Sequence, residues 1–398
     1  MATGPDVTTI PEPVDGRSPR QAVVELAPMA GVTNAAYRQL CREQHEAGGG
    51  TDGLFVCEMI TSRGIVERDR KTMAMLQFDP GETTRSVQLY GVDPATMADA
   101  TQILCEDFAV RHVDLNFGCP VPKVTRKGGG AALPWKRDRL RAILRAVVGA
   151  AQPYGVPVTM KTRIGIDDDH VTYLDAGTIA EEEGCASIAL HGRTAQQSYS
   201  GHADWSTIAK LKEHVSSIRV LGNGDVWEAD DAVRMLDQTG ADGVVVGRGC
   251  LGRPWLFHDL AVALGGGEDT GRRALPTSGE VAATIRRHAG LLAGLQDDPE
   301  HGERRALTDL RKHMAWYLKG YPVGGDTRRA LAMVSSFEEL DVALAALELD
   351  LPFPVGELGT PRGRQGAPKA KVALPEHWLD DTSGAALDLD DDEHVSGG

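Results

Sequence analysis

A cysteine at the end of a predicted strand is the residue of this sequence best placed for chemistry. His112 to Phe117 alternates apolar and polar residues as a half-buried strand does, and Gly118 ends the alternation. Cys119 follows at once, and Pro120 restricts the backbone behind it. Because basic residues come next, the thiol is a candidate for proton transfer. The alternative is a buried cysteine on a tight turn, followed by a solvated basic loop.

Two glycine turns predict a phosphate site. Two predicted strands run into Gly222–Asp225 and Gly247–Gly249. Without a Cβ, the backbone N–H groups of such turns can approach a phosphate closely, and Arg248 adds a positive charge. Either turn alone could simply be a tight strand-to-helix connection, but the pair favours a phosphorylated cofactor.

Lys161 indicates that the cofactor also has a negatively charged group besides its phosphate. It ends the buried run Val158–Lys161, where an unpaired ammonium would be costly, so a negative partner is expected. If the cofactor is flavin mononucleotide (FMN), Lys161 would face the N1/O2 edge of the ring and stabilise the reduced anion. Ala30, Gln88 and His191 would also reach this group. His191 could instead be a structural histidine.

Eight apolar, β-branched segments separated by helical patterns must position these residues. Continuous apolar strands alternating with helices are typical of a parallel sheet with a covered outer face. Eight such units predict an α/β fold, a (β/α)8 TIM barrel, with a doubly wound open sheet as the alternative. The predicted strands are Val23–Gly31, Leu54–Ile60, Arg85–Gly91, His112–Gly118, Val156–Ile164, Ala186–His191, Ser217–Gly222 and Gly243–Gly247.

The unusual residues cluster at the carboxyl ends of these strands, which favours the barrel, because barrel active sites lie at that face. They are Pro28, Met29, Glu58, Gln88, Asn116, Cys119, Lys161, Arg163, His191, Arg193, Asn223, Asp225, Gly247 and Arg248.

The length of 398 residues allows a barrel and a smaller unit. We expect a disordered leader over residues 1–20, the barrel over 21–264 and a small all-α helical domain over 279–350. Residues 351–398, rich in Pro, Gly and Asp, are expected to form a linker and an acidic disordered tail.

The charge pattern points to an anionic polymer. The net charge is -15, yet residues 123–145 carry eight basic residues against one acidic, and residues 304–329 carry seven against two. Solvated helix faces could explain either run, but two runs in an acidic chain suggest local docking patches. The six cysteines have no metal-ligand spacing, so no metal is expected. No apolar run is long enough for a membrane span, and no signal peptide is evident, which predicts a cytoplasmic protein; we expect a monomer.

Successive motifs resemble those of the tRNA-dihydrouridine synthase family, and its bacterial B-type branch most. The resemblance spans roughly residues 23–344. The motifs are Ala27–Thr33, Ser86–Gly91, Asn116–Pro120 with Lys123 and Val124, Lys161–Gly165, His191–Thr194, Gly222–Asp225, Gly247–Gly249, and Arg311–Tyr317 with Arg328 and Arg329 in the helical domain. Asn34 and Ala195 depart from the pattern, where aspartate and arginine are common.

The resemblance implies an FMN-dependent enzyme that reduces the C5=C6 bond of uridines in tRNA, with NADPH or NADH as the electron donor. Hydride would go to C6, and Cys119 would give a proton to C5. The expected FMN ligands are Pro28, Met29, Ala30, Gln88, Lys161, His191, Asn223, Gly224, Asp225, Gly247 and Arg248. The expected substrate contacts are Asn116, Arg193, Arg126, Lys127, Arg311, Lys312, Arg328 and Arg329.

Two other functions remain open at this point. An FMN barrel of the dihydroorotate dehydrogenase type would act on a free pyrimidine and would not need the basic helical domain. A non-catalytic tRNA-binding factor would not need Cys119 and Lys161.

Overall fold

The structure, a computed structural model, describes residues 22–265, 271–298 and 300–384. The predicted leader and the last part of the predicted tail, residues 385–398, lie outside the described residues. Within the described ranges, no helix has the length and apolar character needed to cross a membrane. The same ranges contain no group of three or more His, Cys, Asp or Glu side chains that could hold a metal ion.

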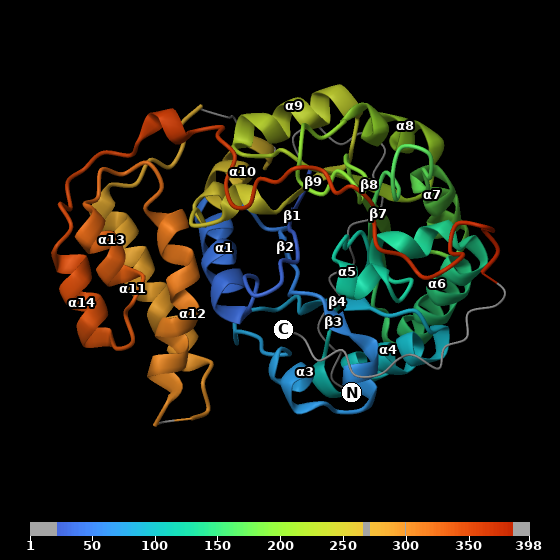
Figure 1. The fold of residues 1–398 in the computed structure, drawn as a ribbon, viewed down its shortest axis with the longest axis horizontal. Coiled ribbons are helices and arrows are strands. Elements are labelled where there is room, and N and C mark those ends of the chain that lie inside the picture. Colours follow the sequence, from blue (N-terminus) through green and yellow to red (C-terminus); the bar gives the residue numbers. More distant parts are fainter. Residues whose placement is uncertain (1–21, 266–270, 299, 385–398) are drawn as a thin grey trace, which may run out of the picture.

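The centre of the fold is a sheet of nine strands, in which all neighbours pair in parallel (Figure 1). Its strand order is β2-β1-β9-β8-β7-β6-β5-β4-β3. The strands are β1 (Val23–Leu26), β2 (Leu54–Phe55), β3 (Ile60–Thr61), β4 (Ser86–Tyr90), β5 (His112–Phe117), β6 (Val158–Arg163), β7 (Ser187–His191), β8 (Arg219–Asn223) and β9 (Gly243–Val246).

The segment Leu54–Thr61 closes the sheet into a barrel. Its first part, β2, pairs with β1, and its last part, β3, pairs with β4. Between them, the Val56 N–H donates to the Leu26 carbonyl at 3.4 Å, and Val56 also forms a bridge with Ser86 of β4. The predicted (β/α)8 barrel is therefore confirmed. The second predicted strand is divided into β2, which pairs with β1, and β3, which pairs with β4, and the backbone bends between them.

Helices cover the outer face of the barrel (Figure 1). Asn34 begins the first of them by accepting a hydrogen bond from the Tyr37 N–H at 3.1 Å, so this departure from the family pattern still caps a helix. The long helices are α1 (Ala35–Ala47), α4 (Pro94–Phe108), α6 (Arg137–Ala151), α7 (Tyr173–Glu182), α8 (Ser206–His214), α9 (Ala229–Thr239) and α10 (Leu256–Leu264). Shorter helices in the loops are α2 (Ser62–Val66), α3 (Arg70–Ala74) and α5 (Pro122–Thr125).

Four further helices form the predicted helical unit beside the barrel (Figure 1). They are α11 (Ser278–Gly294), α12 (Gly302–Tyr317), α13 (Gly325–Leu331) and α14 (Phe337–Ala345). Their buried side chains form a second core, which also includes Ala36 of α1 and Trp255 before α10. Because the core is shared, the helical unit is packed firmly on one side of the barrel.

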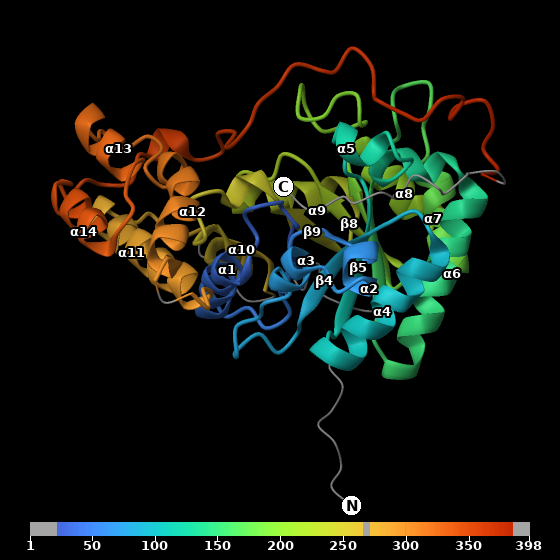
Figure 2. The same cartoon turned by 60° about the horizontal axis from the view of Figure 1, so that its bottom comes forward.

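Residues 351–384, here called the strap, differ from the predicted linker and disordered tail. In Figures 1 and 2 the strap runs from the helical unit across the carboxyl ends of the strands to α6. Phe353, Arg362, Val372 and Trp378 are buried along it. Pro and Gly are frequent in this segment, so its average composition concealed a few widely spaced residues that anchor it to the barrel.

Candidate active site

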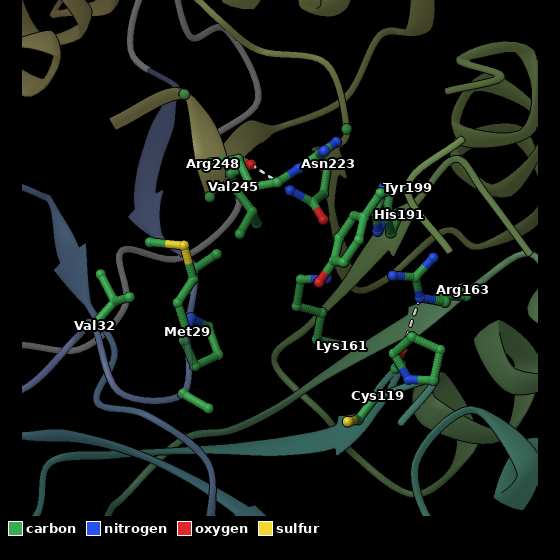
Figure 3. A pocket seen from close by; sticks show the side chains of 18 of the residues that line it. Met29, Val32, Cys119, Lys161, Arg163, His191, Tyr199, Asn223, Val245 and Arg248 are labelled. Atoms are coloured by element: carbon green, nitrogen blue, oxygen red, sulfur yellow. Dashed lines mark hydrogen bonds between the residues drawn. The ribbon is translucent and has the colours of Figure 1, made fainter. Parts of the chain in front are cut away.

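A cavity of about 420 Å³ opens at the carboxyl ends of the barrel strands. That volume is in the range of sites for small ligands and cofactors. In Figure 3 the side chains of Lys161, Cys119 and Tyr199 point into one space, with Met29 on its other side. The predicted residues that line the cavity are Pro28, Met29, Ala30, Gln88, Asn116, Cys119, Lys161, His191, Asn223, Gly224, Asp225, Gly247 and Arg248.

Hydrogen bonds fix the turn that carries Cys119. The Asn116 Oδ1 accepts from the N–H groups of Gly118 at 3.1 Å and Cys119 at 2.9 Å. Arg163 donates from Nε to the Gly118 carbonyl at 2.8 Å, and the Ala131 N–H donates to the Cys119 carbonyl at 3.0 Å. The strand end therefore presents the thiol from a backbone that is held on both sides.

The Cys119 thiol is kept in its protonated form. Burial raises its pKa, although the positive charges of Arg163, Lys369 and Lys161 oppose that effect. A thiol with a raised pKa can act as an acid, and nearby cations would stabilise the thiolate formed when the proton leaves. This combination suits a proton donor better than a nucleophile.

A chain of buried polar groups supports the turn from below. The Asn116 Nδ2 donates to Gln88 Oε1 at 2.8 Å, and Gln88 Nε2 donates to Asp114 Oδ2 at 2.7 Å. Thr159 Oγ1 donates to the other Asp114 oxygen at 2.7 Å and meets His112 Nε2 at 3.0 Å. These hydrogen bonds link β4, β5 and β6, so they fix the orientation of the Gln88 and Asn116 side-chain amides.

Lys161 brings an ammonium without a direct partner into this cavity. Among the described residues, none forms a hydrogen bond or ion pair with it. Burial, and then the charge of Arg163, lower its pKa to about 8, while the buried carboxyls of Asp114 and Glu25 oppose the shift. A half-buried ammonium without a direct partner fits the anionic edge of a flavin ring.

The far side of the cavity fits a phosphate. Gly224 has a φ of 116°, a conformation that a side chain rarely adopts, and a Cβ there would lie 2.7 Å from the Ala203 Cβ. The Arg248 guanidinium lies between two aromatic rings, 4.4 Å from the centre of Tyr199 and 5.0 Å from that of Trp227. The glycine turns thus place a fixed cation beside backbone that carries no side chain, an arrangement that suits a phosphate.

His191 lies between these two parts of the cavity. Burial lowers its pKa well below the usual value, and the surrounding charges of Arg163 and Lys161 add to this effect. The imidazole is therefore neutral at physiological pH, and it can offer one N–H donor to a ligand.

Comparison with known proteins identifies the family of this chain. The sequence model described as "Dihydrouridine synthase (Dus)" matches residues 25–350. The chain belongs to the dihydrouridine synthase family. A relative in Mycobacterium tuberculosis, "Probable tRNA-dihydrouridine synthase", is 52% identical over 387 residues, which cover 97% of this chain and 96% of the relative.

Relatives with a B-type name agree with the resemblance to that branch. "tRNA-dihydrouridine synthase B" of Pseudomonas aeruginosa is 36% identical, covering 81% of this chain and 90% of the relative. The protein of the same name in Shewanella oneidensis is 39% identical, covering 74% and 85%.

Arg193 does not line the cavity of this dihydrouridine synthase, in contrast to the predicted substrate contact. It donates to both oxygens of Asp225 at 2.8 Å, to the Ser200 carbonyl at 3.0 Å and to the Gly201 carbonyl at 2.7 Å. These bonds hold the loop after β7 against the glycine turn after β8. The Asp225 carboxylate also accepts a hydrogen bond from the Ala203 N–H at 2.7 Å, so several contacts fix its orientation at the rim of the cavity.

Asn116 lines the cavity, and its side chain already has several partners. Its Oδ1 accepts from the Cys119 turn, and its Nδ2 donates to Gln88 and, at 3.4 Å, to the Met59 sulfur. These bonds support a role in positioning Cys119, while the predicted uracil contact stays a prediction.

The basic residues predicted to contact tRNA lie outside the cavity and fall into two groups. Arg311 and Arg328 donate to backbone carbonyls of Val334 and Tyr321, at 2.8 and 2.7 Å, so they hold the helical unit together. The others present charge at the surface to different degrees; they are Arg126, Lys127, Lys312 and Arg329. The contact of these residues with tRNA stays a prediction.

Several cavity residues were not among the predicted ligands. Met59 and Arg163 could have been found, since both stand at or near predicted strand ends. Tyr199, Trp316 and Arg364 come from a loop, the helical unit and the strap, and no local pattern connects them with the barrel mouth.

Proposed function

We propose that this chain reduces specific uridines of tRNA to 5,6-dihydrouridine, with bound FMN, with NADPH as the electron source and with Cys119 as the proton donor. Membership of the dihydrouridine synthase family supports the reaction class. The observation that carries the proposal is one cavity lined by a protonated thiol, an ammonium without a direct partner, and two glycine turns beside Arg248.

The donor set of the cavity fits FMN. Lys161 would hold the N1/O2 edge of the ring, where it stabilises negative charge, and Gln88 would hydrogen-bond the ring from β4, two strands away. The turns at Gly224 and Gly247, with Arg248, would hold the phosphate. Bound FMN would supply a hydride to C6 of the uracil.

Cys119 completes the reduction on the other carbon. Its S–H bond breaks as a C–H bond forms at C5, so the uracil gains one hydride and one proton. The thiolate left behind lies in the field of Arg163, Lys369 and Lys161, and water then returns a proton to it. Asn116 holds the turn while this happens.

The target uridine must leave the folded tRNA to reach this depth, which costs a few kcal/mol in lost stacking. The exposed cations Arg126, Lys312 and Arg329 and the partly buried Lys127 would offset part of this cost through contacts with the phosphate backbone, whereas the overall charge of -15 keeps nonspecific binding weak.

The test uses the purified full-length protein. We expect it to bind FMN, and to form dihydrouridine in unmodified tRNA when NADPH is supplied, with no turnover of free uridine or orotate. Reduction of a free pyrimidine but not of tRNA would favour the dihydroorotate-type reaction. Binding of tRNA without any FMN would instead indicate a non-catalytic factor.

A further inference from the structure

The strap begins on the helical unit and reaches the rim of the cavity. Lys319 of the helical unit donates from Nζ to Thr360 Oγ1 at 2.7 Å. Arg362 is buried, and its Nη1 donates to the carbonyls of Trp316 at 3.0 Å and Leu251 at 3.2 Å. The strap is therefore fastened where helical unit and barrel meet.

Its middle part contacts the cavity itself. The carbonyl of Arg364 accepts a hydrogen bond from Arg248 Nη1 at 2.7 Å, and Arg364 lines the cavity. One of the cations expected to hold a phosphate is thus oriented from outside the barrel by this strap.

Lys369 ties together two loops on either side of the mouth. Its backbone N–H donates to the Gln196 carbonyl at 2.9 Å, and Gln196 Nε2 donates back to the Ala370 carbonyl at 3.2 Å. Its Nζ donates to the carbonyl of Pro120, which directly follows Cys119. A strap lysine therefore spans from the loop after β7 to the turn that presents the thiol.

Beyond Lys369 the strap is anchored again. Trp378 is 2% exposed, and its Nε1 donates to the Ala132 carbonyl at 3.1 Å. Its ring packs so closely on Gly128 that a Cβ there would lie 2.3 Å away. Lys136 forms an ion pair with Asp381 at 3.1 Å. With anchors before and after it, Lys369 has little freedom to leave its place.

We propose that the strap is a working part of the active site, and that Lys369 is a positioning residue which holds the Pro120 carbonyl and places a positive charge beside the Cys119 thiol. This rests on the proposed role of Cys119 as proton donor. The matched family domain ends at residue 350, before the strap, whereas the alignment with the Mycobacterium tuberculosis relative covers 97% of the chain and so must include most of it.

The experiment compares three full-length variants. Lys369→Met removes the charge and the donor, and Lys369→Arg keeps both. Lys371→Met is the matched control, because Lys371 is an exposed strap lysine two residues away. For each variant we measure kcat for dihydrouridine formation, FMN affinity, and the rate of iodoacetamide alkylation of Cys119 against pH by peptide mass spectrometry.

Lys369→Met is expected to lower kcat by ~10-fold or more, as for the loss of one charged hydrogen bond, with FMN affinity unchanged. Its alkylation profile should move to higher pH, because removal of a nearby positive charge raises the thiol pKa. Lys369→Arg should restore most of both properties, and Lys371→Met should resemble the unmodified protein.

An alkylation profile of Lys369→Met that coincides with that of the unmodified protein would overturn the proposal, with or without a loss of kcat. A shift of equal size in Lys371→Met would overturn it too. The variant Cys119→Ala tests the proposed function separately. If Cys119→Ala keeps full activity, Cys119 is not the proton donor. The alkylation profiles of the proteins that retain Cys119 would still report whether Lys369 acts on the thiol.

Discussion

The side-chain oxygen of Asn116 accepts a hydrogen bond from the backbone N–H of Cys119 at 2.9 Å. Both residues belong to the same strand end, and the bond turns the chain sharply after β5, so that the thiol faces the cavity. Asn116 is in turn held by Gln88 at 2.8 Å, which links the turn to the polar chain inside the barrel. The position of the thiol is therefore set from within the barrel and, through Lys369, from the strap above it.

The first prediction concerns Asn116. Asn116→Ala leaves the Cys119 turn without its acceptor, and we expect kcat to fall by ~10- to 100-fold, equivalent to ~1–3 kcal/mol for one unsatisfied group. FMN affinity should change little. Asn116→Asp keeps the acceptor oxygen and should retain more activity than Asn116→Ala; equal losses in the two variants would argue against the positioning role.

The second prediction concerns Lys161 and FMN. Lys161→Met removes the free ammonium, and we expect FMN affinity to fall by ~10-fold or more, as for a lost charged hydrogen bond. In the unmodified protein the affinity should decline as pH rises through about 8, where Lys161 loses its proton. Titration with FMN, followed by flavin fluorescence, checks both effects. A Lys161→Met variant that kept the decline would show that another group causes it.

The third prediction concerns the stability of the protein without FMN. The folded-state pKa of Lys161, about 8, lies below its ordinary value of 10.5, so folding disfavours the protonated form. This penalty is fully present below pH 8, declines as pH rises from 8 to 10.5, and is absent above 10.5. At pH 7, Lys161→Met should therefore raise the free energy of unfolding by ~1–3 kcal/mol, measured by urea denaturation. A lower free energy of unfolding for Lys161→Met than for the unmodified protein at pH 7 would contradict this prediction.

The fourth prediction concerns acid stability and His112. Burial lowers the pKa of this imidazole from 6.5 to about 4. Between these two pH values the His112 imidazole binds a proton in the unfolded chain but not in the folded chain. Protonation therefore favours the unfolded state, and the free energy of unfolding falls as pH falls from 6.5 to 4. From pH 7 to pH 5, His112 should contribute a loss of ~2 kcal/mol in the free energy of unfolding.

His112→Gln is the comparison for this effect. It should lose less stability than the unmodified protein over the same pH interval, because the other buried histidines of the described residues are common to both proteins; they are His45, His191, His288 and His313. Identical pH dependence in the two proteins would show that His112 is not the group responsible.

Much of the barrel could be predicted because burial on both faces leaves a strong pattern. The strands β7 and β9 are largely apolar, while β5 and β6 alternate apolar and polar residues, and the polar residues at the strand ends fall at one edge by geometry alone. The bend between β2 and β3 could not be predicted, since it arises from pairing with two separate neighbours.

The limits of the predicted site follow from long-range contacts. Arg193 looks like a ligand in sequence, but its partners are loop carbonyls and Asp225, which only the fold brings near. Lys369 lies 249 residues beyond Pro120 along the chain, in a segment whose composition suggests disorder. No local pattern connects such residues with the strand end that they support.

The most direct test of the account is single-turnover reduction of tRNA by the protein with its FMN reduced beforehand. Mixing with unmodified tRNA should reoxidise the flavin and form an equal amount of dihydrouridine. In Cys119→Ala the same step should be slower by ~100-fold or more, the usual contribution of a general acid, while FMN and tRNA affinities stay unchanged. Dihydrouridine formation by Cys119→Ala at the rate of the unmodified protein would contradict the central claim.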